Sequence, residues 1–378
     1  MSRSKNSLEG KRGTQRRFLE RWLRFRAGEL FRQSRLQDRA LRLERTGLFT
    51  RVDAPRVERL REGGVRVVYP VLESPRNRAV GVLGYAGRNR TVTGLAELDL
   101  GNLGGAGRSV GVRWARPRPR ESRFRLEYRE LLLPRLPLGG RLALEQEVRD
   151  STYSLLVTEG SIEAPLSWAW SARAGLEFQK ASLGIEPAEQ HRRLSTLVGM
   201  RWEGLRRGEW RGGRFDLTVR SGRDRARAPS GRSLGSTRLT RGDLDGESLI
   251  RLHGRTAARI KMLAGAVTGA DTLPASELYR LGGAGQLRGH PEAGFTARRF
   301  GIGQLELGLR SGESWAYLFA DLGTLHGPGA RDLWRWRSGF GVGLNPRVGS
   351  GDVSLDLAFP GALRFGEARV HLRVASRF

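Results

Sequence analysis

The sequence predicts a mainly β chain, a 16-stranded transmembrane antiparallel β-barrel with a small α+β domain in front of it. Apolar and polar side chains alternate from about residue 78 to the C-terminus, which is the period expected of strands. Sixteen segments carry this alternation, and an even number is typical of transmembrane barrels. Short turns follow the even-numbered segments, and long connections follow only odd-numbered ones. A barrel with one rim of turns and one rim of loops produces that pattern.

The composition removes several classes of protein. The chain of 378 residues has no cysteine, which excludes disulfides, thiolate metal sites and cysteine nucleophiles. Its formal net charge is +28, a value typical of nucleic-acid-binding proteins. However, all but four of its 67 basic residues are arginines, and they are spread over the whole length. Because no helix-turn-helix, zinc-finger or aromatic ribonucleoprotein motif accompanies them, we expect no nucleic-acid partner.

The first 77 residues differ from the rest of the chain. Residues 1–19 are basic and polar, and we expect them to be disordered. They contain no apolar stretch and no cleavage site, so we do not expect a signal peptide. Apolar residues recur at helical spacing over residues 30–47, and they alternate between Val65 and Val71. We therefore predict a small helix-and-strand domain over residues 20–75 and the barrel over residues 78–378.

The last strand of the barrel shows the alternation best. Val370, Leu372 and Val374 lie on one face, and arginines and a histidine occupy the positions between them. No run of about 18 apolar residues is present, so we expect strands rather than helices to cross the membrane. The sixteen predicted strands cover residues 78–86, 91–101, 107–116, 122–132, 139–149, 151–162, 167–178, 193–203, 210–220, 246–253, 257–268, 299–310, 313–322, 334–344, 351–359 and 366–378.

Four connections are predicted to be long. One of them, residues 221–245, carries Arg223, Arg225, Arg227 and Arg232. On an external loop these side chains could contact lipopolysaccharide phosphates, although a merely solvated run of charge explains them equally well. The long connections cover residues 179–192, 221–245, 269–298 and 323–333.

A family resemblance rests on motifs near the end of the chain. Leu281-Gly282-Gly283 is followed by Leu287-Arg288-Gly289-His290, on the loop between the eleventh and twelfth predicted strands. This arrangement resembles the BamA/TamA superfamily of outer-membrane assembly and secretion barrels, which also includes the two-partner secretion transporters. The family hallmark is Arg-Gly-aromatic on that loop, and His290 stands here where Tyr or Phe is usual. The resemblance implies a barrel of sixteen strands.

Further motifs extend the resemblance over residues 20–378. Residues 304–307 resemble the glutamate-bearing twelfth strand of the family, and residues 319–323 resemble its Phe-x-Asp-x-Gly strand. At the N-terminus, residues 28–31 and 46–49, followed by Val65–Val71, look like one polypeptide-transport-associated (POTRA) domain. Only one such unit fits before the barrel, whereas the named relatives carry two or more.

The alternation predicts an ion-pair cluster on the inner wall of the barrel. Leu305 and Leu307 share the outward face of the twelfth strand, so Glu306 points inward. By the same parity, Asp321 and Phe319 point inward on the thirteenth strand. Two carboxylates on adjacent strands can bind one guanidinium through planar, charge-assisted hydrogen bonds. We therefore expect Arg288 to be their partner, in a loop where Gly282, Gly283 and Gly289 permit sharp turns.

The resemblance implies a function and a location. Such barrels lie in the outer membrane of Gram-negative-type bacteria and insert or translocate other polypeptides without nucleotide. A weak lateral seam between the first and last strands would template incoming strands. The partners expected for the protein are outer-membrane lipids, lipopolysaccharide, unfolded client polypeptides and accessory periplasmic proteins. In this chain the seam would comprise Val80, Val82 and Tyr85 on the first strand, with Val370, Leu372, Val374 and Phe378 on the last.

Two other membrane functions stay open at this stage. A dedicated secretion pore of the two-partner type would serve one large partner protein. A passive pore with an arginine-rich lumen would select anions. We expect no enzyme, no cofactor and no metal site, because the sequence has no nucleophile elbow, no phosphate-binding loop and no metal-ligand spacing.

Overall fold

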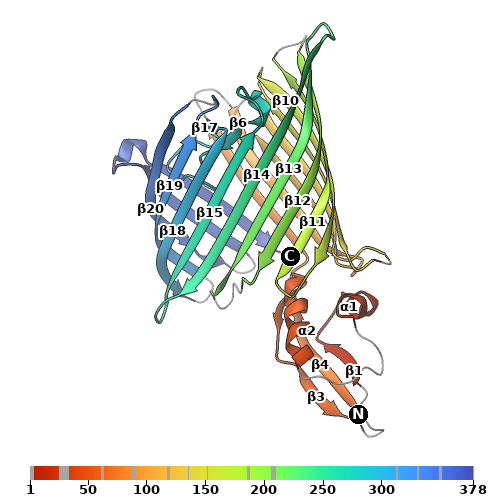
Figure 1. Cartoon of the computed structure of the whole chain (residues 1–378). Coiled ribbons are helices and arrows are strands. Elements are labelled where there is room, and N and C mark those ends of the chain that lie inside the picture. Colours follow the sequence, from red (N-terminus) through yellow and green to blue (C-terminus); the bar gives the residue numbers. More distant parts are fainter. Residues whose placement is uncertain are drawn as a thin grey trace.

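A computed structural model describes residues 4–24, 34–60, 64–86, 91–116, 120–134, 136–150, 152–184, 188–205, 210–311, 314–329, 332–348 and 351–377. The chain forms a large antiparallel sheet that closes on itself, with a small α+β domain beneath one rim (Figure 1). In the described part of the chain, no helix has the length and apolar character needed to cross a membrane.

The N-terminal domain is built around one central strand, β4 (Val65–Glu73). Strand β1 (Ser4–Glu9) pairs with it in parallel, and β2 (Phe49–Val52) and β3 (Arg56–Arg59) pair with it antiparallel. Two helices, α1 (Arg16–Trp22) and α2 (Ser34–Arg45), complete the domain. The helical spacing of Leu36 and Leu43 on α2 turns both side chains into the core, where they meet Val67 and Tyr69 of β4.

The expectation of disorder over residues 1–19 is wrong for most of that segment. Residues 4–9 form β1, and α1 begins at Arg16. Backbone pairing with β4 satisfies the N–H and C=O groups on one side of β1, whatever the charge of its side chains. On α1, Phe18 and Leu19 are buried in the domain core. The Gly28–Phe31 part of the POTRA-like motif lies outside the described residues.

Sixteen strands make up the large sheet, each antiparallel to its neighbours, with the short β21 (Arg347–Val348) as an addition. The last of them, β23, pairs with the first, β5. The strands are β5 (Asn77–Ala86), β6 (Thr91–Leu103), β7 (Arg108–Arg116), β8 (Glu121–Glu130), β9 (Gly139–Arg149), β10 (Tyr153–Pro165), β11 (Trp170–Leu183), β12 (Glu189–Glu203), β13 (Gly212–Arg227), β14 (Ser233–Arg251), β15 (Thr256–Thr268), β18 (Arg299–Ser311), β19 (Ser314–His326), β20 (Trp334–Asn345), β22 (Gly351–Pro360) and β23 (Arg369–Arg377).

Two of the predicted long connections are mostly strand, and a third is strand in its first part. The hairpin of β13 and β14 occupies nearly all of residues 221–245 and leaves only residues 228–232 as its loop. Likewise, β11 and β12 extend into residues 179–192, and β19 extends to His326. Residues 269–298 are a long connection, as predicted, and they contain the 3₁₀ turn η1 (Ala275–Glu277) and the short hairpin of β16 (Tyr279–Leu281) and β17 (Phe295–Ala297).

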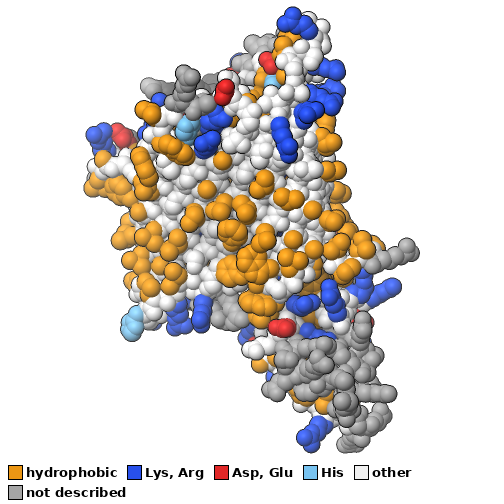
Figure 2. Space-filling model, in the orientation of Figure 1, with side chains coloured by type: hydrophobic (Ala, Val, Ile, Leu, Met, Phe, Trp, Pro, Cys, Tyr) orange, Lys and Arg blue, Asp and Glu red, His pale blue; other side chains and the backbone are white. Residues whose placement is uncertain are grey.

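The alternation of each strand separates two surfaces of the sheet. On β12, Leu194 and Val198 are exposed on the outside, while Arg193, Ser195 and Leu197 are buried on the inside. Hydrophobic side chains therefore form a broad band on the outer face, with Lys and Arg gathered above and below it (Figure 2). This is the distribution expected of a sheet whose outer face contacts lipid.

The N-terminal domain is attached to three successive turns of the barrel. Its Gln15 donates a backbone hydrogen bond to Gly105 O at 2.8 Å, in the β6–β7 turn. From α1, Arg21 donates to Leu133 O in the β8–β9 turn at 2.8 Å, and Arg45 of α2 donates to Ser167 O in the β10–β11 turn at 2.8 Å. Leu132 of the barrel completes the apolar core of the domain. The two parts therefore pack as one unit at this rim.

Candidate functional site

The candidate site is the connection between β15 and β18, which folds onto the inner wall of the barrel. Leu281 and Leu287 of this connection pack against Ile302 of β18 and Leu325 of β19 in an apolar cluster. Leu287 is fully buried, and its side chain lies against Gly323 of β19. We call residues 269–298 the inner loop.

Arg288 of the inner loop is held by two carboxylates of the wall. Its Nε and Nη2 donate to Asp321 of β19 at 2.9 and 2.6 Å, which makes a bidentate pair. Its Nη1 donates to Glu306 of β18 at 2.9 Å, and its backbone N–H donates to Asp321 at 3.0 Å. Each of the three residues is only 2% exposed. The parity of the two strands therefore places the carboxylates where one planar guanidinium reaches both.

Aromatic and acidic neighbours complete the surroundings of Arg288. The guanidinium carbon lies 3.7 Å from the centre of the Phe319 ring, which is a cation–π contact. Asp356 of β22 lies 3.9 Å from Arg288 Nη1 and accepts a hydrogen bond of 2.6 Å from Tyr317. Glu306 also pairs with Arg259 of β15 at 3.2 Å. The guanidinium thus joins the inner loop to β18, β19 and β22.

Glycine is required beside this arginine. Gly289 has a φ of +86°, and a Cβ there would lie within 3 Å of the backbone at Phe359 and Pro360 of β22. Gly282 and Gly283, at φ values of +113° and +88°, turn the chain at the other end of the segment. The inner loop therefore passes against the backbone of β22, two strands along the sheet from β5.

His290 lies in a different environment from Arg288. Its Nε2 is 2.9 Å from Ser338 O of β20, and its ring meets Phe295 edge to face at a centroid distance of 5.2 Å. The flat ring predicted at this position therefore fixes the loop to β20 and to β17.

A second anchor of the inner loop was missed by sequence reasoning. Glu277 in η1 is buried and pairs with Arg193 of β12, with Arg193 Nη1 2.7 Å from a carboxylate oxygen. Gln179 of β11 donates to the other Glu277 oxygen and accepts a 2.6 Å hydrogen bond from Arg193. The inward parity of Arg193 was readable in the sequence, but no motif linked it to Glu277, 84 residues away. The inner loop is therefore tied to opposite parts of the sheet.

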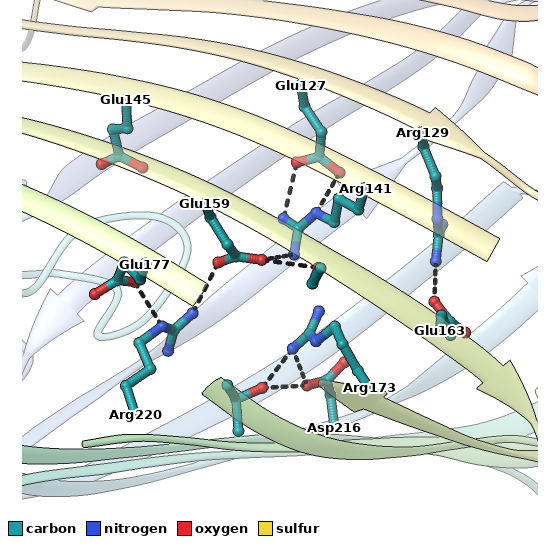
Figure 3. Close-up of polar contacts among 12 residues, drawn as sticks. Glu127, Arg129, Arg141, Glu145, Glu159, Glu163, Arg173, Glu177, Asp216 and Arg220 are labelled. Atoms are coloured by element: carbon teal, nitrogen blue, oxygen red, sulfur yellow. Dashed lines mark hydrogen bonds and ion pairs between the residues drawn. The ribbon is translucent and has the colours of Figure 1, made fainter. Parts of the chain in front are cut away.

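Ion pairs cover the inner wall next to that anchor (Figure 3). Arg141 of β9 binds Glu127 of β8 at 2.9 Å and Glu159 of β10 at 3.2 Å. Glu159 also pairs with Arg220 of β13 at 3.4 Å, and Arg220 in turn pairs with Glu177 of β11 at 2.7 Å. Arg141 bridges β9 to both of its neighbours, whereas Arg220 reaches past β12 to β11 and β10, so the chain of charges runs from β8 to β13.

The pairing of β5 with β23 is short. It comprises four residue pairs, from Gly81 with Val374 to Arg78 with Arg377. By contrast, β5 pairs with β6 over ten residues and β23 pairs with β22 over eight. Among the described residues, every other neighbouring pair of the sixteen strands has a longer register.

The residues expected at this seam fall into three groups. Val80 is paired with Ala375, whereas Val82 and Tyr85 lie on the part of β5 beyond the register with β23. Val370, Leu372 and Val374 are exposed on the outer face of β23. Phe378 lies outside the described residues.

The sixteen-stranded sheet and its inner-loop arginine define the class of protein. The chain belongs to the Omp85 superfamily, whose domain matches residues 102–378. This confirms the superfamily expected from the Arg288 motif.

Solved structures show the same fold. The chain is similar to BamA from Haemophilus ducreyi lacking POTRA domains 1-3, with a TM-score of 0.60 and 18% identity over 100% of this chain and 84% of that one. It is also similar to CdiB from Acinetobacter baumannii, with a TM-score of 0.66 and 14% identity over 100% and 74% of the two chains. For CdiB from Escherichia coli the values are 0.66, 15%, 100% and 76%. No curated protein matches the sequence.

Proposed function

We propose that this chain is an outer-membrane barrel of a Gram-negative-type bacterium that inserts or translocates other polypeptides without nucleotide. The observation that carries the proposal is the four-residue register between β5 and β23. Strand edges that lack partners present rows of N–H and C=O groups to any other chain. An incoming strand can pair with such an edge by backbone hydrogen bonds alone, which requires no chemical catalyst.

The proposed location in a membrane is supported by the outer surface of the barrel. The apolar band covers the outward positions of the strands, and the N-terminal domain lies beneath one rim (Figures 1 and 2). We assign that domain as one POTRA-like unit on the periplasmic side, where accessory proteins and unfolded clients would meet it. Its α+β composition and the Thr46–Phe49 turn between α2 and β2 support this assignment.

The inner loop supports the wall next to the seam. Arg288 reaches Glu306 and Asp321, and Gly289 lies against β22, the neighbour of β23. We infer that the Arg288 cluster holds this part of the wall in register while the β5 edge is free to exchange partners. Loss of the cluster would then impair client handling even where the sixteen strands still form.

Two alternatives belong to the same membrane location. A dedicated two-partner-type secretion pore is favoured by the likeness to the two CdiB structures. A passive anion-selective pore would use the many arginines of the inner wall, but most of those described are already paired with carboxylates, as Arg141 and Arg220 are. The pore alternative also leaves the short seam without a role.

Photocrosslinking in the source cell tests the proposal. A photoreactive amino acid replaces Val82 in the full chain, and captured polypeptides are identified by mass spectrometry. Val198, exposed on β12 far from the seam, serves as the matched control position. We expect several unrelated barrel precursors at position 82, few at position 198, and a loss of capture when Arg288→Ala is added. One large exoprotein would instead identify a dedicated secretion pore. Absence of any captured chain would contradict the seam mechanism.

A further inference from the structure

We propose that the outer surface of strands β11–β14 binds the phosphate groups of anionic membrane lipids. The residues are Lys180, Arg192 and Arg225 in one row, with Arg223 and Arg238 in the next, and we call these five the cationic ladder. They lie at the end of the barrel away from the N-terminal domain. The inference rests on the membrane placement proposed above but is independent of client handling.

Strand register brings the five charges together. Lys180 is paired with Arg192, and Arg192 with Arg225, across three neighbouring strands. Arg223 is paired with Arg238 across the next hairpin. Because neighbouring strands lie about 4.8 Å apart, like charges stand side by side. Such pairs destabilise a sheet unless a counter-charge offsets their repulsion.

The ladder points away from the lumen. All five side chains are exposed, whereas the residues between them on the same strands, such as Gln179, Arg193 and Asp224, are buried on the inner wall. The two faces of these strands therefore differ in how their cations are neutralised. On the inside, Arg193 is bound by Glu277. On the outside, in the part of the chain that the structure describes, the ladder has no acidic partner, and the outward positions at this end of β11–β14 carry no Asp or Glu.

Below the ladder the surface changes in steps. On β12–β14 the next row toward the apolar band consists of hydroxyl side chains, with Thr196 paired to Ser221 and Ser221 to Thr240, and Leu176 of β11 continues the row. Ser221 Oγ lies 3.0 Å from Thr240 Oγ1, and Arg238 donates to Ser221 Oγ at 3.1 Å. The row after that begins the aliphatic surface with Val198 opposite Val219. Cations, hydroxyls and aliphatic side chains follow in the order of the phosphate, polar and acyl layers of a lipid leaflet.

Strand tilt accounts for apolar residues at the height of the ladder. Phe178 and Leu194 share a register row with Arg223. In a membrane barrel the strands tilt by about 35–45°, so a register row crosses the membrane surface obliquely. The apolar end of the row then lies deeper than its cationic end. Lys and Arg gather above the apolar band on this face in the space-filling view (Figure 2).

The chemistry of the cationic ladder and of the aliphatic surface beside it favours phosphate groups that are attached to lipid. Guanidinium groups bind phosphate oxygens through paired, charge-assisted hydrogen bonds. Four of the five cations are arginines, and they adjoin an exposed aliphatic surface. A lipid that carries phosphate on its headgroup contacts both surfaces at once, whereas free phosphate contacts only the cations. A diphosphorylated glycolipid such as lipid A fits two adjacent rows.

Native mass spectrometry of the full chain in a neutral detergent tests the inference. The protein is titrated with lipid A, and the variant R192Q/R223Q/R225Q/R238Q is compared with a control, R12Q/R17Q/R56Q/R59Q. The control removes four exposed arginines of the N-terminal domain, so the change in net charge is the same. We expect the ladder variant to bind lipid A at least about tenfold more weakly, and the control to bind within about twofold of wild type.

Further arms separate the outcomes. Excess inorganic phosphate should displace little lipid A, and phosphatidylcholine should not bind measurably tighter to wild type than to the ladder variant. Folding of each variant is verified by its heat-modifiable mobility, and R223Q/R238Q serves as a milder variant with an intermediate loss. Equal lipid A affinity of the ladder variant and wild type overturns the inference. An equal loss in the control also overturns it, because the binding would then follow net charge alone. Because the readout is lipid binding, failure here is distinguishable from failure of client capture.

Discussion

At the residue scale, the geometry around Arg288 depends on the shape of its side chain and not only on its charge. Three of its N–H donors meet Glu306 and Asp321 at distances between 2.6 and 2.9 Å. A lysine carries one compact ammonium group and cannot match both carboxylates through a planar fork. Because both carboxylates are buried, water cannot take the place of a lost guanidinium as their hydrogen-bond donor.

Replacement of Arg288 should therefore destabilise the barrel in a graded way. We expect Arg288→Ala to lower the free energy of unfolding by about 3 to 5 kcal/mol, because two buried carboxylates lose a partner. Arg288→Lys should lie between the alanine variant and wild type. Denaturant-induced unfolding in micelles measures both, with Arg335→Ala, at an exposed position on β20, as the control. A lysine variant as stable as wild type would show that charge alone is sufficient.

The Glu277–Arg193 anchor permits a test by exchange of charges. Either Glu277→Arg or Arg193→Glu alone places two like charges in a buried site, and each should lower the free energy of unfolding by about 3 kcal/mol or more. The double variant restores opposite charges, so it should recover a large part of that loss. Hydrogen exchange of residues 275–281 should change in the same order. Losses that simply add in the double variant would mean that the two side chains do not interact.

At this scale, the sequence predicted the Arg288 anchor, which belongs to a motif, but not the Glu277 anchor, which belongs to none. Arg288, Glu306 and Asp321 were identified because parity orients the carboxylates and the family resemblance singles out the arginine. Glu277 and Arg193 meet because the inner loop crosses the interior of the barrel. The residues next to each of them in the sequence do not indicate the course of this loop.

At the scale of elements, alternation predicted the strands but not all of their ends. The β13–β14 hairpin extends past the predicted boundaries at residues 220 and 246. Above the apolar band both faces of this hairpin are polar, with Asp224 inside and Arg223 outside, so the period-two signal disappears. Strand length beyond the membrane is therefore invisible to hydropathy patterns, whereas strand length within it is not.

The short register of β5 with β23 predicts that a covalent lock will stop activity. Gly81 and Val374 are paired at the seam, and cysteines at both positions lie at a separation that a disulfide can bridge. The chain has no cysteine of its own, so no other disulfide competes. We expect the oxidised G81C/V374C variant to lose client insertion in reconstituted vesicles and to regain it on reduction.

A matched lock elsewhere gives the control for that experiment. Val198 and Val219 are paired between β12 and β13, within a register of fourteen residue pairs. The oxidised V198C/V219C variant should retain insertion, because those strands have no reason to separate. If both locks stop insertion, or if neither does, the seam is not the place where clients pair.

At the scale of the whole molecule, Glu73 controls how the N-terminal segment meets the barrel. Its carboxylate accepts hydrogen bonds from the backbone N–H groups of Gly13 and Thr14 at 3.0 and 2.9 Å. Thr14 in turn accepts a hydrogen bond of 2.8 Å from Asn102 at the β6–β7 turn. Burial raises the pKa of Glu73, but the hydrogen bonds from Thr14 and Gly13 outweigh it and bring the pKa below its ordinary value.

The lowered pKa of Glu73 predicts that the N-terminal segment is held less firmly against the barrel in acid. Because the pKa of Glu73 is lowered in the folded state, its contribution is fully present above the unfolded pKa and is lost as pH falls through the folded pKa. We expect the hydrogen-exchange protection of Gly13 and Thr14, corrected for intrinsic rate, to fall below about pH 4. Glu73→Gln should show weak protection already at pH 7 and little further change. Protection in wild type that stays constant down to pH 3 would contradict this assignment.

The attachment of the N-terminal domain also decides which strands are free to move. The domain hydrogen-bonds to the turns at Gly105, Leu133 and Ser167, so it connects three successive turns of one rim. These contacts would oppose the separation of β6–β11 at that rim. β5 lies outside this set of strands, between β6 and β23. Torque applied to the domain would therefore be transmitted through β6 to β5 and to its four-residue register with β23, so a force on the small domain would open the large sheet where its backbone pairing is shortest.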